Sequence, residues 1–94
     1  MRLKGKKLRE LNQQIHERDG NCCVVCGVYV RDGEKFHHVK RNKLIKNDVI
    51  EEGVTLCMNC HTEVHHGKTS NVFKEKINEY LFDLYPEYWE KGMN

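Results

Sequence analysis

Two Cys-x-x-Cys pairs restrict the folds open to this chain more than any other feature of its sequence. The first pair is Cys23 and Cys26, and the second, Cys57 and Cys60, follows after residues 27–56. Each pair offers two thiolates, and four thiolates can surround one Zn²⁺ ion tetrahedrally. A chain of 94 residues buries little apolar surface. We therefore expect a structural zinc ion at these cysteines to supply much of the folding free energy.

The fifth cysteine, Cys22, leaves one alternative open, because a Cys22-x-x-x-Cys26 spacing would also allow two thiolates to bind one ion. We favour Cys23, since its spacing from Cys26 matches that of the second pair. A thioredoxin-like redox motif is disfavoured, because such a motif belongs beside a βαβ pattern that this sequence lacks.

The composition favours one soluble domain over residues 1–94. The longest apolar stretches span only a few residues, so no transmembrane helix is expected. Residues 1–7 lack the apolar segment that a secretory signal needs. We therefore expect a cytoplasmic protein with no membrane partner, in which paired cysteines bind metal rather than form disulfides.

The net charge of +2 divides unevenly along the chain. Residues 1–47 hold 12 Lys/Arg and 5 Asp/Glu, a balance of +7, whereas residues 48–94 hold 4 and 9, a balance of −5. A basic half can attract a polyanion, because neutralising phosphates releases counterions and gives sequence-independent affinity. A solvated surface explains the same pattern about equally well.

Periodicity and turn signals predict an α+β fold built from short elements. Leu8, Leu11 and Ile15 recur at helical spacing and predict a first helix that ends at Arg18, after a flexible basic tail over residues 1–6. The other expected elements are a β-hairpin of residues 28–30 and 36–39, a strand at 54–56, a helix at 58–66 and a carboxy-terminal helix at 71–85. The aromatic residues at the end of the chain are expected to pack rather than to stack on bases; they are Tyr85, Tyr88 and Trp89.

The histidines form a second group, close to the second cysteine pair and the predicted hairpin. His61 and His65 are four residues apart on the predicted helix and therefore share a face. His37 and His38 lie on a predicted strand and should point to opposite faces, so one can bind a metal while the other acts as a base. For the two remaining histidines an ordinary hydrogen-bonded or surface role is favoured; these are His16 and His66.

The segment His61-Thr62-Glu63-Val64-His65 also invites comparison with zinc proteases of the His-Glu-x-x-His type. Glu63 stands one position too late for that motif. On a helix this shift rotates the side chain by about 100° from the place of the general base. The sequence therefore disfavours a protease.

Taken in order, these motifs resemble the HNH, or ββα-metal, nuclease family. The resemblance covers residues 17–67, which would form the core of a single nuclease domain. It is carried by Glu17-Arg18-Asp19-Gly20, Cys23-x-x-Cys26-Gly27, Phe36-His37-His38-Val39 and Val54-Thr55-Leu56-Cys57-x-x-Cys60-His61-x-x-x-His65. Members of this family form a β-hairpin followed by a helix around a catalytic metal, and many add a four-cysteine zinc ion. Here an amino-terminal and a carboxy-terminal helix would flank that fold.

The resemblance implies a metal-dependent endonuclease that hydrolyses phosphodiester bonds of DNA, above all double-stranded DNA. His38 would be the general base that activates water, and the catalytic divalent ion would be held by His37, His61 and His65. Three neutral imidazole ligands favour Mn²⁺, Ni²⁺ or Zn²⁺ over Mg²⁺. The implied contacts to the DNA backbone come from the basic residues Lys40, Arg41, Lys43 and Lys46. With so little chain outside the motif, strong sequence specificity would require a dimer or a partner protein.

One position departs from the family pattern. Glu52 stands where members often carry the asparagine that gives the family its middle letter, and Asn47 is a candidate to take over part of its role. Two other functions compete with the nuclease. One is a non-catalytic zinc module that binds nucleic acid through the basic half, and the other is a scaffold for protein interactions.

Overall fold

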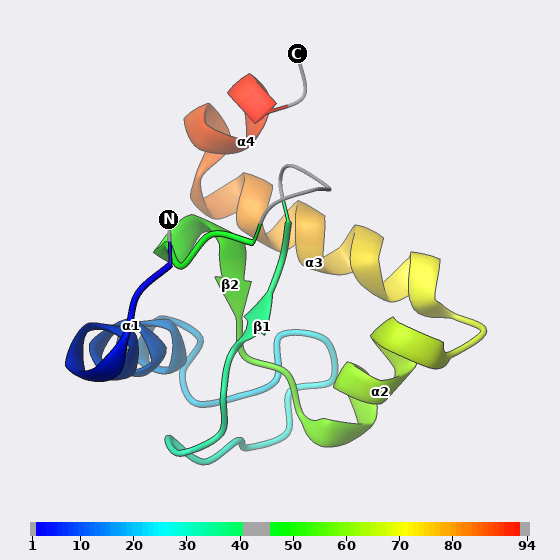
Figure 1. Ribbon diagram of the computed structural model, residues 1–94. Helices are drawn as coiled ribbons and strands as arrows, with labels where there is room; N and C mark the ends of the chain where they lie inside the picture. The colour runs from blue at the N-terminus through cyan, green and yellow to red at the C-terminus, as the bar shows by residue number, and fades with distance from the viewer. Residues whose placement is uncertain (1, 41–45, 93–94) are drawn as a thin grey trace.

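Helices surround a two-stranded antiparallel sheet in the computed structural model, which describes residues 2–40 and 46–92. In chain order the elements are α1 (Gly5–Arg18), β1 (His37–His38), the 3-10 turn η1 (Ile50–Glu52), β2 (Gly53–Val54), α2 (Met58–His66), α3 (Ser70–Leu84) and α4 (Pro86–Gly92). Figure 1 shows α1 on one side of the sheet and α2 with α3 on the other. This arrangement confirms the α+β class, and α2 matches the predicted helix at 58–66.

The sheet joins β1 to β2 across the long connection that separates them in sequence. The paired residues are His37 with Val54 and His38 with Gly53. Beyond the strands, the amide of Val39 donates to the carbonyl of Glu52 at 2.8 Å and adds one more bond to the ladder. Two paired strands and then helix α2 therefore follow one another along the chain.

The predicted hairpin of residues 28–30 with residues 36–39 is wrong. Residues 28–30 turn back on the first cysteine pair, where Tyr29 forms an isolated bridge with Cys22. Apolar alternation identifies segments that can form strands but does not identify their partners. Here the partner of the histidine strand is the later segment at residues 53–54.

Helix α1 begins at Gly5, so the predicted basic tail of residues 1–6 overlaps it. Before the helix, the Nε of Arg2 and the amide of Leu3 donate to the carboxylate of Asp48 at 3.1 and 2.7 Å. Asp48 is buried, with 2% of its surface exposed. The prediction of a free tail is wrong for these residues, because a buried carboxylate distant in sequence binds them.

The apolar face of α1 packs directly on β2. Leu11 and Ile15 are buried and form one core cluster with Phe36. Gly53 permits this approach, because a Cβ atom at that position would lie 2.6 Å from Ile15 Cδ1 and 2.8 Å from Phe36 Cδ2. Close packing, and not an unusual backbone angle, therefore requires a glycine here, since Gly53 is extended with φ −139°.

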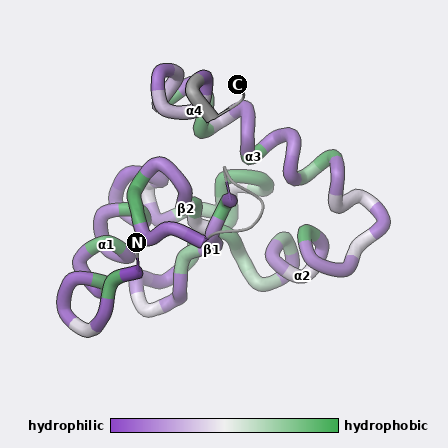
Figure 2. Tube along the Cα trace, turned by 45° about the horizontal axis from the view of Figure 1, so that its top comes forward, coloured by the Kyte–Doolittle hydropathy of each residue, from purple (hydrophilic) through white to green (hydrophobic). Residues whose placement is uncertain are grey.

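A second core cluster lies on the other side of the sheet. Ile77 and Leu81 of α3 are buried there together with Val54 and Val64. Figure 2 shows apolar residues alternating with polar ones along α3, as expected for a helix with one buried face. The helix lies one residue earlier at each end than the predicted span of 71–85.

Helix α4 lies beyond the carboxy-terminal helix predicted at 71–85 and was not expected, because proline often ends a helix. Proline is well suited to the first position of a helix, where its missing amide costs no hydrogen bond, and Pro86 begins α4. Trp89 of this helix is buried, and its Nε1 donates to the carbonyl of Glu51 at 3.0 Å. The packing role expected for this aromatic residue is confirmed.

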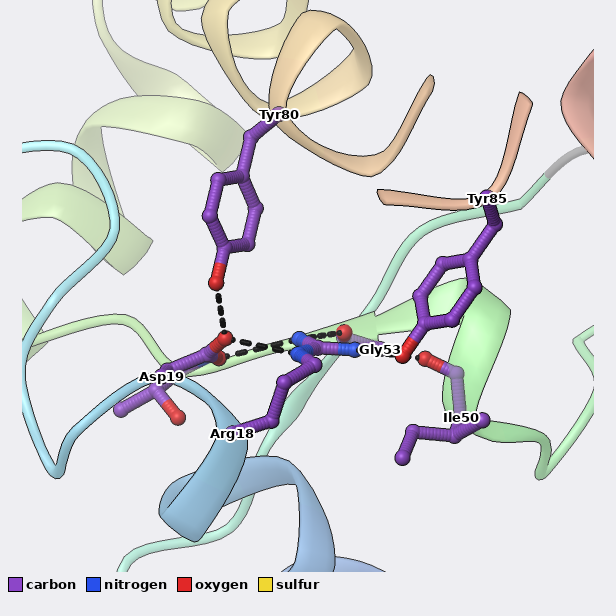
Figure 3. Close-up of polar contacts among 7 residues, drawn as sticks. Arg18, Asp19, Ile50, Gly53, Tyr80 and Tyr85 are labelled. Atoms are coloured by element: carbon purple, nitrogen blue, oxygen red, sulfur yellow. Dashed lines mark hydrogen bonds and ion pairs between the residues drawn. The ribbon is translucent and has the colours of Figure 1, made fainter. Parts of the chain in front are cut away.

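Arg18 and Asp19, at the carboxyl end of α1, connect three elements of the fold (Figure 3). Arg18 forms an ion pair with Asp19 at 2.8 Å and donates to the carbonyls of Ile50 and Gly53 at 2.8 and 2.7 Å. Asp19 also accepts a hydrogen bond from the hydroxyl of Tyr80 at 2.6 Å. Helix α1, the segment that leads into β2 and helix α3 are thereby fixed to one another.

Candidate metal centres

Four cysteine sulfurs converge at one point of the fold. The Sγ atoms of Cys23, Cys26, Cys57 and Cys60 all lie within 4.8 Å of one another. The Sγ atoms of Cys26 and Cys57 are 3.6 Å apart and all five cysteines are free thiols. Two thiolates on one tetrahedral zinc ion are expected about 3.8 Å apart, given Zn–S bonds of about 2.3 Å. The predicted set, with Cys23 rather than Cys22, can therefore hold a metal ion such as zinc.

Local backbone structure brings the two cysteine pairs together. Gly27, whose φ of +83° is readily adopted by glycine, follows the first pair. Cys57 caps the amino end of α2, where its Sγ accepts a hydrogen bond from the amide of Cys60 at 3.5 Å. The amide of Val24 donates to the carbonyl of Thr55 at 3.0 Å and joins the first pair to the chain that leads into the second.

The electrostatics of this cluster favour a bound cation. Burial raises the pKa of Cys23, but hydrogen bonds from the amides of Cys26, Cys57 and Val25 outweigh burial and lower it to about 7. Burial and the neighbouring thiols raise the pKa of Cys60. Because thiolates repel one another, a divalent cation at their centre stabilises the deprotonated set.

Three histidines form a second cluster, between β1 and α2. One ring nitrogen from each of His37, His61 and His65 lies within 4.8 Å of the other two. The Nε2 atoms of His61 and His65 are 3.1 Å apart. Two imidazole nitrogens on one zinc ion are expected about 3.3 Å apart, given Zn–N bonds of about 2.05 Å. The three side chains have the donor chemistry and the spacing of a divalent-metal site.

The most buried ring of this cluster is held in its neutral form. Burial, and then the neighbouring rings of His61 and His65, lower the pKa of His37 to about 3. The pKa of His65 is lowered for the same two kinds of reason, burial first. A neutral imidazole keeps a free nitrogen lone pair at neutral pH, which is the form that binds a metal ion.

His38 takes no part in the histidine cluster, in agreement with the predicted division of the two neighbours on one strand. Its Nε2 lies 2.6 Å from Oδ1 of Asp48, and its ring packs against Phe36 with 4.7 Å between ring centroids. The side chain of His38 is 10% exposed and that of Asp48 is fully buried. The adjacent histidines therefore have different partners, His37 facing imidazoles and His38 facing a carboxylate.

An open pocket of about 440 Å³ joins these two regions. It is lined by His37, His38, Val39, Lys40, Val64, His65, Lys74, Ile77 and Asn78. The pocket thus contains a member of the histidine cluster from each of β1 and α2, together with His38. Two lysine side chains give it a positive border, which suits an anionic ligand.

Two of the four basic residues expected to contact nucleic acid lie in the described part of the chain. Lys40 is exposed and lines the pocket. Lys46 is exposed, and its charge contributes to the lowered pKa values of two clustered histidines. Arg41 and Lys43 lie outside the described residues.

Glu52, which the sequence resemblance aligned with an asparagine, is buried and hydrogen-bonded. Its carboxylate accepts hydrogen bonds from the hydroxyl of Tyr88 and, at 3.4 Å, from the side-chain amide of Asn47. Asn47 is therefore a direct neighbour of the position whose role it was predicted to share. These contacts link the loop before β2 to α4.

Two further side chains have roles that agree with the sequence analysis. The carboxylate of Glu63 accepts hydrogen bonds from both the amide and the hydroxyl of Thr69, at 2.9 and 2.6 Å, and so closes the turn between α2 and α3. His16 is fully buried, with its Nε2 2.7 Å from the carbonyl of Glu34. Glu63 has a structural partner instead of a zinc-protease arrangement, and His16 has the hydrogen-bonded role expected of it.

Three residues of the site were not predicted from the sequence. Asp48 bonds to His38 across ten positions of sequence, while Lys74 and Asn78 reach the pocket from α3. The only available signal for the last two was their spacing of four on a predicted helix, which gives them a common face. Nothing in the sequence indicates that this face lies beside the histidines.

Comparison of the chain with protein-family models, with curated proteins and with solved structures finds no match. Among residues 2–40 and 46–92, no helix combines the length and apolarity needed to cross a bilayer.

Proposed function

We propose that this protein is a metal-dependent endonuclease of the HNH type that hydrolyses phosphodiester bonds of DNA. The observation that carries the proposal is the convergence of His37, His61 and His65 within 4.8 Å, beside a pocket that His38 also lines. The order of two paired strands and a helix around this cluster supports it. Such a combination of metal ligands, a separate imidazole and an open pocket is what hydrolytic chemistry requires.

His38 is the general base of the proposed reaction. Its imidazole accepts a proton from a water molecule, whose oxygen forms a bond to phosphorus as the bond to the leaving oxygen breaks. A divalent ion bound by the three histidines would stabilise negative charge on the phosphoryl and leaving oxygens. The imidazole ligands favour Mn²⁺, Ni²⁺ or Zn²⁺ over Mg²⁺.

The four-cysteine cluster has a different role in this proposal. A tetrahedral zinc ion bound by four thiolates has no open position for substrate, so it stabilises the fold without taking part in hydrolysis. Lys40 and Lys74 border the pocket and bind backbone phosphates of double-stranded DNA. Recognition of a particular sequence would come from a second copy or from a partner protein.

The test is nicking of supercoiled plasmid by the zinc-loaded protein, with and without added Mn²⁺, Ni²⁺, Zn²⁺ or Mg²⁺. The wild type should nick in a metal-dependent way, and His38→Ala should lose this activity while it still binds DNA and retains its metals. Binding without cleavage under every metal would favour the competing function, a non-catalytic nucleic-acid-binding zinc module. Equal cleavage by wild type and His38→Ala would remove His38 from the mechanism.

A further inference from the structure

Asp48 is a buried carboxylate whose two oxygens have separate partners. Oδ1 lies 2.6 Å from Nε2 of His38. Oδ2 accepts hydrogen bonds from the Nε of Arg2 at 3.1 Å and from the amide of Leu3 at 2.7 Å. The carboxylate is thus held from one side by the segment before α1 and presents its other oxygen to the ring of His38.

These contacts keep Asp48 ionised. Burial raises the pKa of this carboxyl, but the hydrogen bonds from His38, Leu3 and Arg2 outweigh burial and lower the pKa below its ordinary value. An ionised carboxylate can only accept hydrogen bonds, so Nε2 of His38 must carry the proton that lies between them. The lone pair of a neutral imidazole is then on Nδ1.

The ring of His38 is also restrained from a second direction. Its centroid lies 4.7 Å from that of Phe36, whose side chain is buried against α1. Pairing of His38 with Gly53 in the sheet fixes the backbone from which the ring projects. Hydrogen bonding, ring packing and strand pairing together restrain the orientation of the imidazole.

On the basis of the proposed function, we propose that Asp48 is the positioning residue for His38. Its carboxylate keeps the imidazole proton on Nε2 and so makes Nδ1 the atom that accepts the proton of the attacking water. Arg2 and Leu3 hold the carboxylate in this place. Asp48 acts through His38 and does not itself contact the reacting atoms.

The chain offers a matched control for a purely structural role, because Asp19 is also a fully buried aspartate paired with an arginine. Its partners are Arg18, the hydroxyl of Tyr80 and the amide of Thr55. None of these lines the pocket that contains His38. Asp19→Asn should therefore lower stability while leaving the cleavage rate per folded molecule unchanged.

The experiment compares wild type, Asp48→Asn and Asp19→Asn in plasmid nicking, with kcat and KM determined separately and melting temperatures measured in parallel. Asp48→Asn keeps the size of the side chain, so a folded protein is expected. Its kcat should fall by about 100-fold, in line with loss of the orienting partner of a functional histidine. KM and the metal content should stay unchanged. In wild type, ¹⁵N correlation spectra of the His38 ring should show the proton on Nε2.

Two results would overturn the inference while leaving the nuclease intact. In the first, the wild type cuts DNA and the kcat of Asp48→Asn lies within about twofold of the wild-type kcat. Loss of an orienting partner reduces activity far more than this. The other is a neutral His38 with its proton on Nδ1. A wild type that fails to cut DNA with any of the added metals would remove the proposed function and this inference together. The two failures are therefore distinguishable.

Discussion

The four-cysteine cluster and the three-histidine cluster share helix α2 but differ in how they are built. Each half of the cysteine cluster is a short local motif, the first a turn and the second the capped start of α2, and the four sulfurs could complete the tetrahedral shell of one zinc ion. The histidine cluster joins a strand to a helix, offers three ring nitrogens and opens on a pocket. A closed set of ligands suits stability, whereas an incomplete set beside a pocket suits chemistry. Substitutions in the two clusters and around them should therefore have different effects.

The largest expected effect is loss of folding in Cys57→Ser. Binding of a structural zinc ion contributes on the order of 10 kcal/mol, which is comparable to the whole stability of a small domain. Circular dichroism should show no cooperative melting, and metal analysis should show no tightly bound zinc. Cys22→Ser is the control, because Cys22 lies outside the cluster. An unchanged melting temperature in Cys57→Ser would remove the structural role of this cluster.

The next largest effect is loss of cleavage in a folded His65→Ala variant. Removing one of three ligands should abolish binding of the divalent ion and reduce the rate by on the order of 10³-fold, since such an ion contributes several kcal/mol. Its melting temperature should stay near that of the wild type, because His65 is exposed. His66→Ala, the exposed neighbour outside the cluster, should cut normally. Similar rate losses in both variants would contradict the ligand assignment.

Gly53→Ala should have an intermediate effect, because it should lower stability without releasing zinc from the four-cysteine cluster. The added methyl group meets Ile15 and Phe36 at 2.6 and 2.8 Å, so the contact between α1 and β2 must open. We expect a loss of about 1–3 kcal/mol in the free energy of unfolding, measured by urea denaturation. The zinc content should be retained, since the three atoms nearest to an added Cβ belong to Ile15 and Phe36 and not to a cysteine.

Gly33→Ala serves as the control for this variant, because nothing lies within 4 Å of a Cβ atom there. Its stability should change by less than about 0.5 kcal/mol. Equal stability losses in the two glycine variants would show that close packing on β2 is not the cause.

The smallest expected effect is a weakened affinity for DNA in Lys74→Ala. Loss of one phosphate contact should reduce the slope of log affinity against log salt by about 0.9, without change in base preference. Fluorescence anisotropy at several salt concentrations measures this slope. Lys76→Ala is matched in charge and helix but does not line the pocket, so its slope should stay that of the wild type. A shared decrease would place DNA elsewhere on α3.

The comparison also explains which features could be predicted from the sequence. The cysteine cluster could be predicted because each pair has a metal-binding spacing within four residues. The His61/His65 pair could be predicted because helical spacing places both side chains on one face. His37 and His38 were separated correctly because neighbours on a strand point to opposite faces.

Features that depend on contacts between segments distant in sequence could not be predicted from the sequence. The partner strand of the histidine pair was assigned to residues 28–30, because alternation gives no information on pairing. The bond from Asp48 to His38 and the entry of Lys74 into the pocket depend on how the elements pack. Helix α4 was missed because Pro86 can end one helix or begin another.

Helix α2 gives the two clusters a common piece of backbone. Cys60 and His61 are consecutive residues, and the amino end of the helix is capped by Cys57. A zinc-bound thiolate of Cys57 would therefore fix the start of α2. Because the helix is rigid, it would also fix the positions of the His61 and His65 imidazoles. Loading of the cysteines would have to precede assembly of the histidine site. If the proposed function holds, a newly made chain would leave DNA uncut until zinc reached it, and cleavage would depend on the zinc supply of its surroundings.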